Sequence, residues 1–251
     1  MNNSIRFEHI IKSILFNIYF YFLTIVLVLV CFPLLLFSYK GMRIVSKLWG
    51  MILKSGMKIC LRLDINIIGK LNTKKQVIYA VKHHSAWETV FCTDFFKMPA
   101  IVLKKELIFL PIIGLYFLIG GSIAISRENT LASLKKISVK AKKASEKGRS
   151  IMIFPQGTRV PIDANTKKYP YLPGVYFIYK QSNLPIVPVA HNAGMFWPKN
   201  SFLKYTNNLK SNSVSIEILD EIPVGLSKND FMQILESKIE NATKKLIEKE
   251  R

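Results

Sequence analysis

The sequence has few of the groups that bind metal ions or form covalent cross-links. Its 251 residues include three cysteines and four histidines. Cys31, Cys60 and Cys92 are far apart and lie in apolar runs, which is typical of buried free thiols in a reducing compartment and not of a disulfide framework. The histidines are not accompanied by carboxylates or thiols at ligand spacing, so neither a metal site nor another cofactor is expected.

Acidic side chains are also scarce. The chain has 16 Asp and Glu against 36 Lys and Arg, which gives a formal net charge of +20 and a pI near 9.9. Such a balance suits nucleic acid, anionic lipid headgroups or acidic substrates. The sequence lacks the aromatic pattern of ribonucleoprotein domains and the spacing of zinc fingers, so nucleic acid is not an expected partner.

Only one apolar run is long enough to cross a membrane. Residues 14–37 contain no charged side chain, and at about 1.5 Å per residue a helix of this length would cross a hydrocarbon core of about 30 Å. Pro33 offers an alternative, in which the helix turns back within one leaflet. Basic residues lie on both sides of the run, so the positive-inside rule selects no orientation. Membrane embedding is expected, and spanning and dipping both stay open.

The next segment, residues 42–61, mixes large apolar side chains with lysines. This composition indicates an amphipathic helix at the membrane interface, with an ordinary core-facing helix as the alternative. From residue 61 an alternation typical of strands begins. The chain is therefore divided into membrane-embedded and interfacial helices, residues 1–60, and one α/β domain, residues 61–251.

The second part alternates short apolar runs with helical periodicities. Strands are expected at residues 61–67, 77–81, 101–103, 123–125, 151–154, 185–190 and 214–218, and helices at residues 86–96, 130–147 and 231–246. Short apolar strands that alternate with helices are typical of a parallel sheet covered on both faces. The strand at 185–190 contains Pro188, which favours a place near the edge. The predicted fold class is α/β, with a mixed, largely parallel sheet flanked by helices.

A histidine and an acid follow the strand at 77–81. A chain leaving a parallel strand emerges at the carboxyl edge of the sheet, where α/β proteins usually keep their chemistry. There the sequence places His83 and, five residues later, Glu88. Five residues along a regular helix would separate the two side chains, so they meet only if His83 precedes a helix and Glu88 lies in its first turn. Ser85 with Glu88 forms a capping box that starts such a helix. One interpretation is a catalytic base with its orienting acid. The alternative is that Ser85 and Glu88 only start a helix and that His83 and His84 are exposed turn residues.

A second loop follows the strand at 151–154. It reads Pro155-Gln156-Gly157-Thr158-Arg159, in which proline and glycine favour a tight turn and Thr158 and Arg159 offer hydrogen-bond donors. A loop of this kind at the carboxyl end of a strand either holds a phosphate or is an ordinary turn.

Four blocks of this sequence, in this order and spacing, resemble the 1-acylglycerol-3-phosphate acyltransferases of the glycerolipid acyltransferase family. The resemblance covers roughly residues 61–225 and implies the fold of that family. The family's blocks are His-x4-Asp, a segment ending in arginine, Phe-Pro-Glu-Gly-Thr-Arg and a proline-bearing segment. Their counterparts here are His83-x4-Glu88, Ile123 to Arg127, Phe154 to Arg159 and Leu184 to Val189.

Two positions depart from the family pattern. Glu88 stands where the family usually has aspartate, so the carboxylate is kept on a longer side chain. Gln156 replaces the acid of the third block. If that acid contributes charge, Gln156 has lost it, and if it holds the loop by hydrogen bonds, a glutamine still serves.

The resemblance implies transfer of a fatty acyl group from a thioester to the sn-2 hydroxyl of lysophosphatidic acid, giving phosphatidic acid. His83 would be the base and Glu88 would orient it. Arg127, Gly157, Thr158 and Arg159 would bind the phosphate, with Pro155 and Gln156 supporting the loop. The implied localisation is the bacterial inner membrane, with the catalytic domain on the cytoplasmic side.

Several alternatives stay open. The donor is either acyl-CoA or acyl-carrier protein, and the lysine-rich helix at 130–147 suits an acidic carrier or anionic lipid, unless it is only a solvated face. The apolar stretch at 107–119 lines an acyl-chain pocket, touches the membrane or packs in the core. The acceptor is lysophosphatidic acid, another lysophospholipid or a lipid of the ornithine type. A catalytically silent protein that binds anionic lipid is the alternative of a different class.

Overall fold

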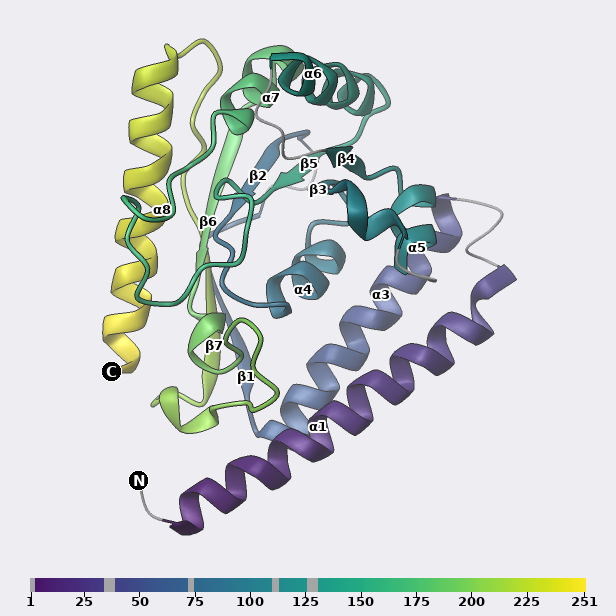
Figure 1. Ribbon diagram of the computed structural model, residues 1–251, viewed down its shortest axis with the longest axis vertical. Coiled ribbons are helices and arrows are strands. Elements are labelled where there is room, and N and C mark those ends of the chain that lie inside the picture. The colour runs from purple at the N-terminus through teal and green to yellow at the C-terminus, as the bar shows by residue number, and fades with distance from the viewer. Residues whose placement is uncertain (1–2, 34–38, 72–74, 110–112, 126–130) are drawn as a thin grey trace.

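Strands far apart in the sequence form one sheet in the computed structural model, which describes residues 3–33, 39–71, 75–109, 113–125 and 131–251 (Figure 1). Within these residues the strand order is β1-β7-β6-β2-β5-β3-β4. The strands are β1 (Asp64–Ile68), β2 (Ile78–Val81), β3 (Ala100–Lys104), β4 (Ile123–Ile125), β5 (Ile151–Ile153), β6 (Ile186–His191) and β7 (Ser213–Ile218).

Parallel pairing dominates the sheet. The β6–β7 pair is antiparallel, whereas β1–β7, β6–β2, β2–β5, β5–β3 and β3–β4 are parallel. Ala80 of β2 pairs with Ile153 of β5 and Pro188 of β6. The segments that follow these three strands therefore leave the sheet at the same edge. This arrangement confirms the predicted mixed, largely parallel α/β fold.

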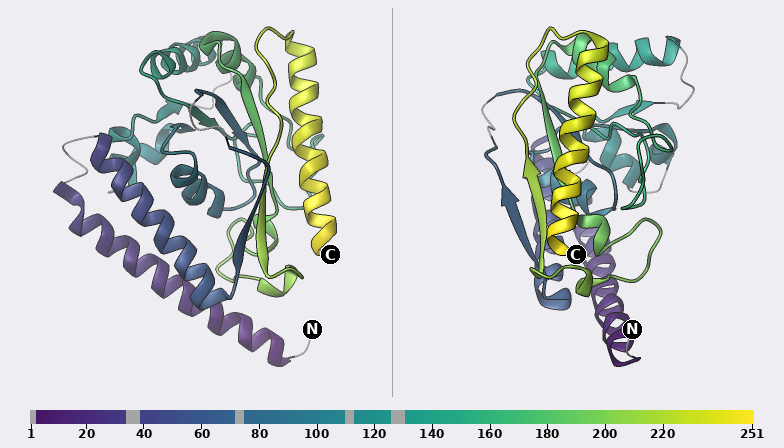
Figure 2. Two further views of the ribbon diagram at one scale, coloured as in Figure 1. Left: turned by 180° about the vertical axis from the view of Figure 1, so that it is seen from behind. Right: turned by 90° about the vertical axis from the view of Figure 1, so that its left-hand side faces the viewer.

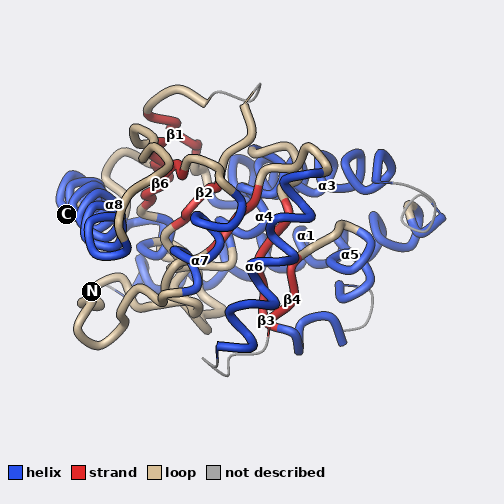
Figure 3. Tube along the Cα trace, turned by 90° about the horizontal axis from the view of Figure 1, so that it is seen from above, coloured by secondary structure: helices blue, strands red, loops and turns tan. Residues whose placement is uncertain are grey.

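Helices cover both faces of the sheet, as Figures 2 and 3 show from three directions. α4 (Trp87–Phe95) lies on one face together with α1 (Asn3–Val30) and α3 (Tyr39–Gly56), and α6 (Leu131–Glu146), α7 (Gly174–Ser182) and α8 (Lys228–Glu250) lie on the other. Short helical segments connect these layers: η1 (Met57–Leu61), η2 (Lys105–Phe109), α5 (Ile113–Ile119), η3 (Ala193–Met195) and η4 (Thr206–Asn208).

Alternation along the strands divides the apolar core between these two faces. Tyr79 and Val81 of β2 face the α4 side, whereas Ile78 and Ala80 face α6, α7 and α8, because successive strand residues point to opposite faces. All four residues of β2 are buried. This explains why β2 is a continuous apolar run and not an alternating one.

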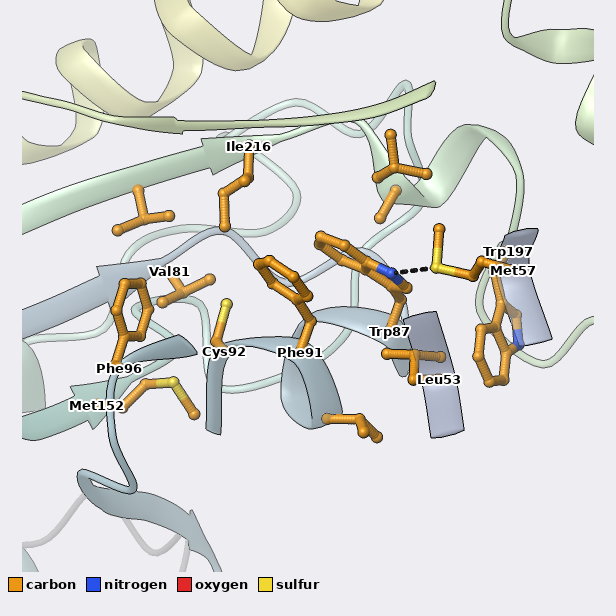
Figure 4. Close-up of a cluster of buried hydrophobic side chains, with 14 of the residues drawn as sticks. Leu53, Met57, Val81, Trp87, Phe91, Cys92, Phe96, Met152, Trp197 and Ile216 are labelled. Carbon is orange, nitrogen blue, oxygen red and sulfur yellow. Dashed lines mark hydrogen bonds between the residues drawn. The ribbon is translucent and has the colours of Figure 1, made fainter. Parts of the chain in front are cut away.

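The core on the α4 side is rich in aromatic rings and sulfur (Figure 4). The Trp87 and Phe91 rings stack with centroids 4.5 Å apart. The Trp87 indole N–H donates to the Met57 sulfur at 3.0 Å, so the helix that carries Glu88 is fixed to the end of α3. Truncating a buried aromatic of this kind to alanine typically costs about 3–5 kcal/mol.

The N-terminal helices α1 and α3 lie side by side as an antiparallel pair (Figures 1 and 2). Trp49 donates to Thr24 Oγ1 at 3.0 Å and Tyr19 donates to Ser55 Oγ at 3.0 Å. Residues Phe7–Val30 have a mean hydropathy of 2.3, and 22% of the most apolar stretch is buried. By length and composition this segment could cross a membrane, and the part of the predicted run at residues 34–37 lies outside the described residues.

A buried lysine joins α1 to the rest of the protein. Lys204 is 1% exposed, and its ammonium donates to Asn17 Oδ1 at 3.1 Å and to the Phe202 carbonyl at 2.8 Å. The ammonium also lies 4.4 Å from the centroid of the Trp197 ring. Burial lowers the pKa of Lys204 to about 8. The side of α1 that faces the protein thus carries polar anchors, while its outer side is apolar.

Two details of the sequence prediction are wrong. The first strand begins at Asp64 and not at residue 61, because Leu61 ends the helical turn of η1 and Arg62 has a left-handed φ of 55°. The strand at 185–190 is central and not near an edge, since β6 lies between β2 and β7.

Pro188 is tolerated inside β6 because the pairing of β6 with β7 is interrupted at this residue. Ile186 and Ile222 exchange backbone hydrogen bonds on one side of the interruption, and the β6–β7 ladder resumes at Val189 and Ile218 on the other. The Pro188 carbonyl accepts from the Leu219 N–H at 3.0 Å. No ladder bond therefore requires an N–H at Pro188.

Candidate active site

The loop after β2 brings His83 and Glu88 together at the carboxyl edge of the sheet. His83 Nδ1 lies 2.7 Å from Glu88 Oε1. His83 precedes α4, and Glu88 lies in the first turn of that helix. The contact expected from the five-residue spacing is confirmed.

Glu88 also holds the start of α4. Its Oε1 accepts the Ser85 backbone N–H at 2.8 Å, and the Ser85 hydroxyl accepts the Trp87 N–H at 3.1 Å. Of the two hydrogen bonds of the predicted capping box, the one from the Ser85 N–H to the acid is present. The Ser85 hydroxyl, however, accepts the N–H two residues later and not the N–H three residues later. The helix start and the His83 contact are therefore two roles of one carboxylate.

Glu88 is ionised in spite of its burial. The side chain is completely buried, and burial alone would raise its pKa. The nearby His191 imidazole, the His83 hydrogen bond and the Ser85 N–H outweigh burial and lower the pKa of Glu88. An ionised carboxylate can only accept hydrogen bonds, so the His83 Nδ1–H is the donor to Glu88. In this tautomer His83 Nε2 carries no hydrogen and keeps its lone pair.

His83 is held rigidly but is not sealed off. Its side chain is 15% exposed, and its ring stacks on Phe154 with centroids 3.9 Å apart. Its carbonyl accepts the Val160 N–H at 2.8 Å. The ring therefore has a fixed orientation, with Phe154 on one face and Glu88 at Nδ1.

A third member of this cluster, His191, was missed at the sequence level. It ends β6 and is fully buried. Its Nε2 donates to the Lys82 carbonyl at 2.6 Å, and its Nδ1 accepts the Ala193 N–H at 3.2 Å. Burial lowers the pKa of His191, so the ring is neutral at pH 7. A histidine that directly follows the buried strand 185–190 was a signal that could have identified it.

His191 also lies close to the acid. Its Nε2 is 3.8 Å from Glu88 Oε2, and Glu88 Oε2 has no hydrogen-bond partner among the described residues. This distance is too long for a hydrogen bond. His191 therefore packs beside the His83–Glu88 pair without a hydrogen bond to Glu88. Its hydrogen bond to the carbonyl of Lys82, the residue before His83, helps to position the loop that carries His83 and Glu88.

Lys82 anchors the same loop to α8. Its side chain is 2% exposed, and its ammonium lies 2.5 Å from Glu240 Oε1. The Tyr171 hydroxyl donates to the same Glu240 oxygen at 2.8 Å. Removing one partner would leave a buried, uncompensated charge, so this ion pair stabilises the position of the loop immediately before His83.

His84, the next residue, has a different environment. It is 2% exposed, and its Nδ1 has no hydrogen-bond partner among the described residues. Burial, followed by the nearby His191 and Lys82, lowers the pKa of His84 well below its ordinary value. The alternative that His83 and His84 are both exposed turn residues is therefore wrong for His84.

The loop at 155–159 lies beside His83. Gly157 has a φ of 64°, and its N–H closes a turn on the Phe154 carbonyl at 2.9 Å. The buried Gln156 donates from Nε2 to the Tyr169 carbonyl at 3.0 Å, and the Pro155 carbonyl accepts the Leu172 N–H at 2.9 Å. Gln156 and Pro155 thus hold this loop.

The predicted phosphate ligands are only partly brought together. Thr158 and Arg159 are half-buried and follow the Gly157 turn. Arg159 forms no ion pair with a residue that the structure describes. Arg127 lies outside the described residues.

An apolar cavity of about 270 Å³ opens next to His83. Its wall includes Leu107 and Phe117, which belong to the apolar stretch at 107–119. The remaining apolar wall comes from β3, β4, β5, α6 and α7 and includes Val102, Leu103, Ile125, Leu134, Ile137, Ile153, Val175 and Ile178. A largely apolar cavity lined by few polar side chains, His83 among them, suits a substrate with a long hydrocarbon part.

Over the described parts of the chain, no three His, Cys, Asp or Glu side chains gather as metal ligands. Cys31 and Cys92 are buried free thiols, and Cys60 is a partly exposed free thiol.

Comparison with known proteins agrees with this site. The sequence profile of the Acyltransferase family matches residues 62–192, just over half of the chain. A 1-acyl-sn-glycerol-3-phosphate acyltransferase of Pseudomonas aeruginosa is 34% identical over 137 residues, which cover 55% of this chain and 52% of that protein. The corresponding protein of Limnanthes alba is 29% identical over 199 residues, which cover 74% of this chain and 69% of that protein.

A solved structure shares the fold. The crystal structure of the 1-acyl-sn-glycerophosphate (LPA) acyltransferase PlsC from Thermotoga maritima superposes with a TM-score of 0.73 at 19% identity, over 95% of this chain and 97% of that chain. The matched segment spans about half the length of the Pseudomonas relative. The family match over residues 62–192 contains both His83 and Glu88, and the chain therefore belongs to the acyltransferase family.

Proposed function

We propose that this protein transfers a fatty acyl group from a thioester to the sn-2 hydroxyl of 1-acylglycerol-3-phosphate, giving phosphatidic acid. The observation that carries the proposal is the His83–Glu88 contact of 2.7 Å at the mouth of an apolar cavity, in a chain of the acyltransferase family. The curated relatives that name a substrate of this kind favour it over other lysolipid acceptors.

His83 acts as the general base. Its Nε2 takes the proton of the acceptor hydroxyl while that oxygen attacks the thioester carbonyl carbon. Glu88 holds the Nδ1–H tautomer and stabilises the imidazolium that forms. The C–S bond then breaks, and the leaving thiolate takes the proton from His83. The acceptor oxygen is the nucleophile, so no acyl-enzyme is formed, and base catalysis of this kind contributes roughly 10²–10⁴ in rate.

The apolar cavity receives the acyl chain of the donor. Its wall is formed mainly by aliphatic and aromatic side chains, and the His83 imidazole is part of it. An acyl chain buried there would bring its thioester carbonyl to the base, since the polar end of the chain must stay outside the apolar wall.

The turn at residues 157–159 binds the phosphate of the acceptor, together with Arg127. Arg159 is half-buried and has no ion-pair partner among the described residues, so its guanidinium is available for bidentate contact with a phosphate. The loop is fixed by the Gln156 contact to Tyr169. Gln156 therefore holds the loop by a hydrogen bond although it lacks the charge of the family's acid. Its presence does not favour the alternative of a catalytically silent protein.

The N-terminal helices hold the protein at a membrane. Large apolar side chains lie exposed along the outer side of α1, among them Phe7, Leu15, Ile18, Phe22, Ile25 and Leu29. Exposed apolar area of this extent favours contact with lipid. Both the acceptor and the product are lipids, so attachment would deliver them to the site. The sheet then lies on the cytoplasmic side of the bacterial inner membrane, where acyl-CoA and acyl-carrier protein are found.

The experiment that tests this function is acyl transfer by membranes that contain the protein. Lysophosphatidic acid is supplied with labelled acyl-CoA or labelled acyl-carrier protein, and wild type is compared with His83→Ala and with His83→Gln, which keeps a hydrogen-bonding side chain beside Glu88. Both variants are expected to lose transfer while they stay membrane-bound, and His83→Gln should keep a melting temperature close to that of wild type. Equal activity in all three proteins would exclude His83 as the base.

Acceptor identity is tested in the same assay. Replacing lysophosphatidic acid by a lysophospholipid with a larger headgroup is expected to remove most of the transfer. Transfer to the substitute but not to lysophosphatidic acid would assign another acceptor, and binding of anionic vesicles without any transfer would assign a silent lipid-binding protein.

A further inference from the structure

A second and larger cavity lies beside the catalytic loop. It has a volume of about 730 Å³ and is enclosed by residues 160–163, by η3 and the loop that follows it, and by the end of α8. Ligand sites commonly measure roughly 300–1,000 Å³. His84 lines this cavity, whereas His83 lines the apolar one. The two cavities therefore lie next to adjacent residues of one loop.

The charged residues that line this cavity differ in how their charges are held. Of its charged residues, Arg251 is paired with Asp163, and the Glu250 carboxylate accepts the Ser211 N–H and hydroxyl at 2.9 and 2.6 Å. Lys199 and Lys210 are exposed at the rim and form no ion pair with a residue that the structure describes. An anionic ligand in the cavity would meet two ammonium groups that no described carboxylate holds in an ion pair.

The cavity also contains a buried polar group without a partner. His84 Nδ1 is buried and accepts or donates no hydrogen bond among the described residues. Gly194 packs against the same ring, since a Cβ at that position would lie 2.7 Å from the His84 Cβ. Buried polar side chains are normally satisfied, so an unsatisfied imidazole beside a cavity indicates a ligand with a hydrogen-bonding group.

The position of the cavity relates it to the donor. Val160 lines it, and the Val160 N–H holds the His83 carbonyl at 2.8 Å. If the acyl chain occupies the apolar cavity and its carbonyl lies at His83, the rest of the donor must leave the site by another route. That remainder is a polar arm with two amides that ends in a phosphate, and it is the same in acyl-CoA and in acyl-carrier protein.

We propose that this cavity binds the phosphopantetheine arm of the thioester donor, with an amide of the arm bonded to His84 and its phosphate bonded to Lys199 and Lys210. The inference rests on the proposed acyl transfer. It assigns the donor phosphate to a cavity that Arg159 and Gly157 of the proposed acceptor-phosphate turn do not line.

Steady-state kinetics test the inference in the full-length protein. The paired variant Lys199→Gln with Lys210→Gln is compared with a matched pair, Lys180→Gln with Lys245→Gln, which removes two exposed charges that do not line the cavity. The first pair should raise KM for acyl-CoA by roughly tenfold, as expected from the loss of hydrogen bonds to a charged phosphate, and should leave KM for lysophosphatidic acid unchanged. An unchanged donor KM, or a rise in the acceptor KM alone, would overturn the assignment.

Direct binding separates this inference from the proposed function. Calorimetry with CoA, with phosphopantetheine and with glycerol 3-phosphate requires no transfer reaction. Wild type should bind the first two, and both Lys199→Gln with Lys210→Gln and Gly194→Val, which pushes against His84, should bind them at least several-fold more weakly. Absence of CoA and phosphopantetheine binding, or a preference for glycerol 3-phosphate, refutes the site. Binding without any acyl transfer would uphold the site and refute the acyltransferase proposal.

Discussion

Two adjacent histidines border two very different regions of this molecule. His83 is partly exposed, bonded to the ionised Glu88 and stacked on Phe154, and it lines an apolar cavity. His84 is buried, lacks a described partner at Nδ1 and lines a larger cavity with a polar, basic rim. The two residues have the same ionisable group, so the difference between a base and a neutral binding group comes entirely from their surroundings.

The comparison shows what makes an imidazole suitable for proton transfer. A carboxylate at Nδ1 stabilises the protonated ring, and access at Nε2 lets a substrate reach the lone pair. His84 lacks the carboxylate, because its buried surroundings contain His191 and Lys82 in place of an acid. Chemistry is therefore expected on the apolar side of the loop and ligand recognition on the polar side.

The largest effect is expected from removing the acid that distinguishes the two histidines. In Glu88→Gln the charge that stabilises the His83 imidazolium is lost, and we expect kcat to fall by roughly 10²–10⁴. The measurement is transfer from a labelled thioester at saturating substrates. Glu248→Gln, which changes an exposed acid on α8, is the control, and a Glu88→Gln enzyme with wild-type kcat would show that the His83–Glu88 contact is only a helix start.

The next effect concerns the loop at 155–159, which lines the apolar cavity with Pro155 and Gly157 and continues into residues 160–163, which line the larger one. Gln156→Glu places a carboxylate against the Tyr169 carbonyl in a buried site, so the hydrogen bond is lost and the free energy of unfolding should fall by about 1–3 kcal/mol. For a chain of this size, each kcal/mol of lost stability lowers the melting temperature by about 2–4 °C. Higher activity with unchanged stability would instead show that the charge of the family's acid is needed.

A smaller effect should appear on the apolar side alone. Gly174 lines the apolar cavity, and a Cβ there would lie 3.8 Å from Leu134 Cδ2, an ordinary contact. Gly174→Leu should therefore fold and shorten the cavity, lowering kcat/KM for the longest acyl chains by roughly tenfold and sparing short chains. Gly174→Ala is the matched control, and equal losses at every chain length would place the acyl chain elsewhere.

The smallest effect is expected in the acid dependence of stability. The pKa of Glu88 is lowered in the folded protein, so its ionised form contributes stability that is fully present above its unfolded pKa of about 4.3. That contribution is lost as the pH falls through the lowered folded pKa. Wild type should lose melting temperature below about pH 4.3 more steeply than Glu88→Gln does. Parallel curves would mean that Glu88 is not held ionised by its contacts.

Much of the fold could be predicted because its signals are local. The strands at residues 77–81, 123–125 and 151–154 and the helix at 130–147 follow from runs of neighbouring residues, since burial on both faces requires continuous apolar strands. The mixed, largely parallel sheet followed from this alternation. The two errors arose where local signals mislead: Leu61 and Leu63 alternate like a strand but pack against helices, and Pro188 lies opposite an interruption in β7.

The sequence by itself determined that His83 and Glu88 can meet, because a five-residue separation brings them together only across a helix start. Only the tertiary structure decided what surrounds them. Lys82 meets Glu240 and the Lys82 carbonyl meets His191 across 158 and 109 residues, and Gly194 confines His84. Such contacts depend on the order of strands in the sheet, which no neighbouring residues encode. For that reason local spacing identified the His83–Glu88 pair, whereas the two cavities and the contacts of the third histidine required the fold.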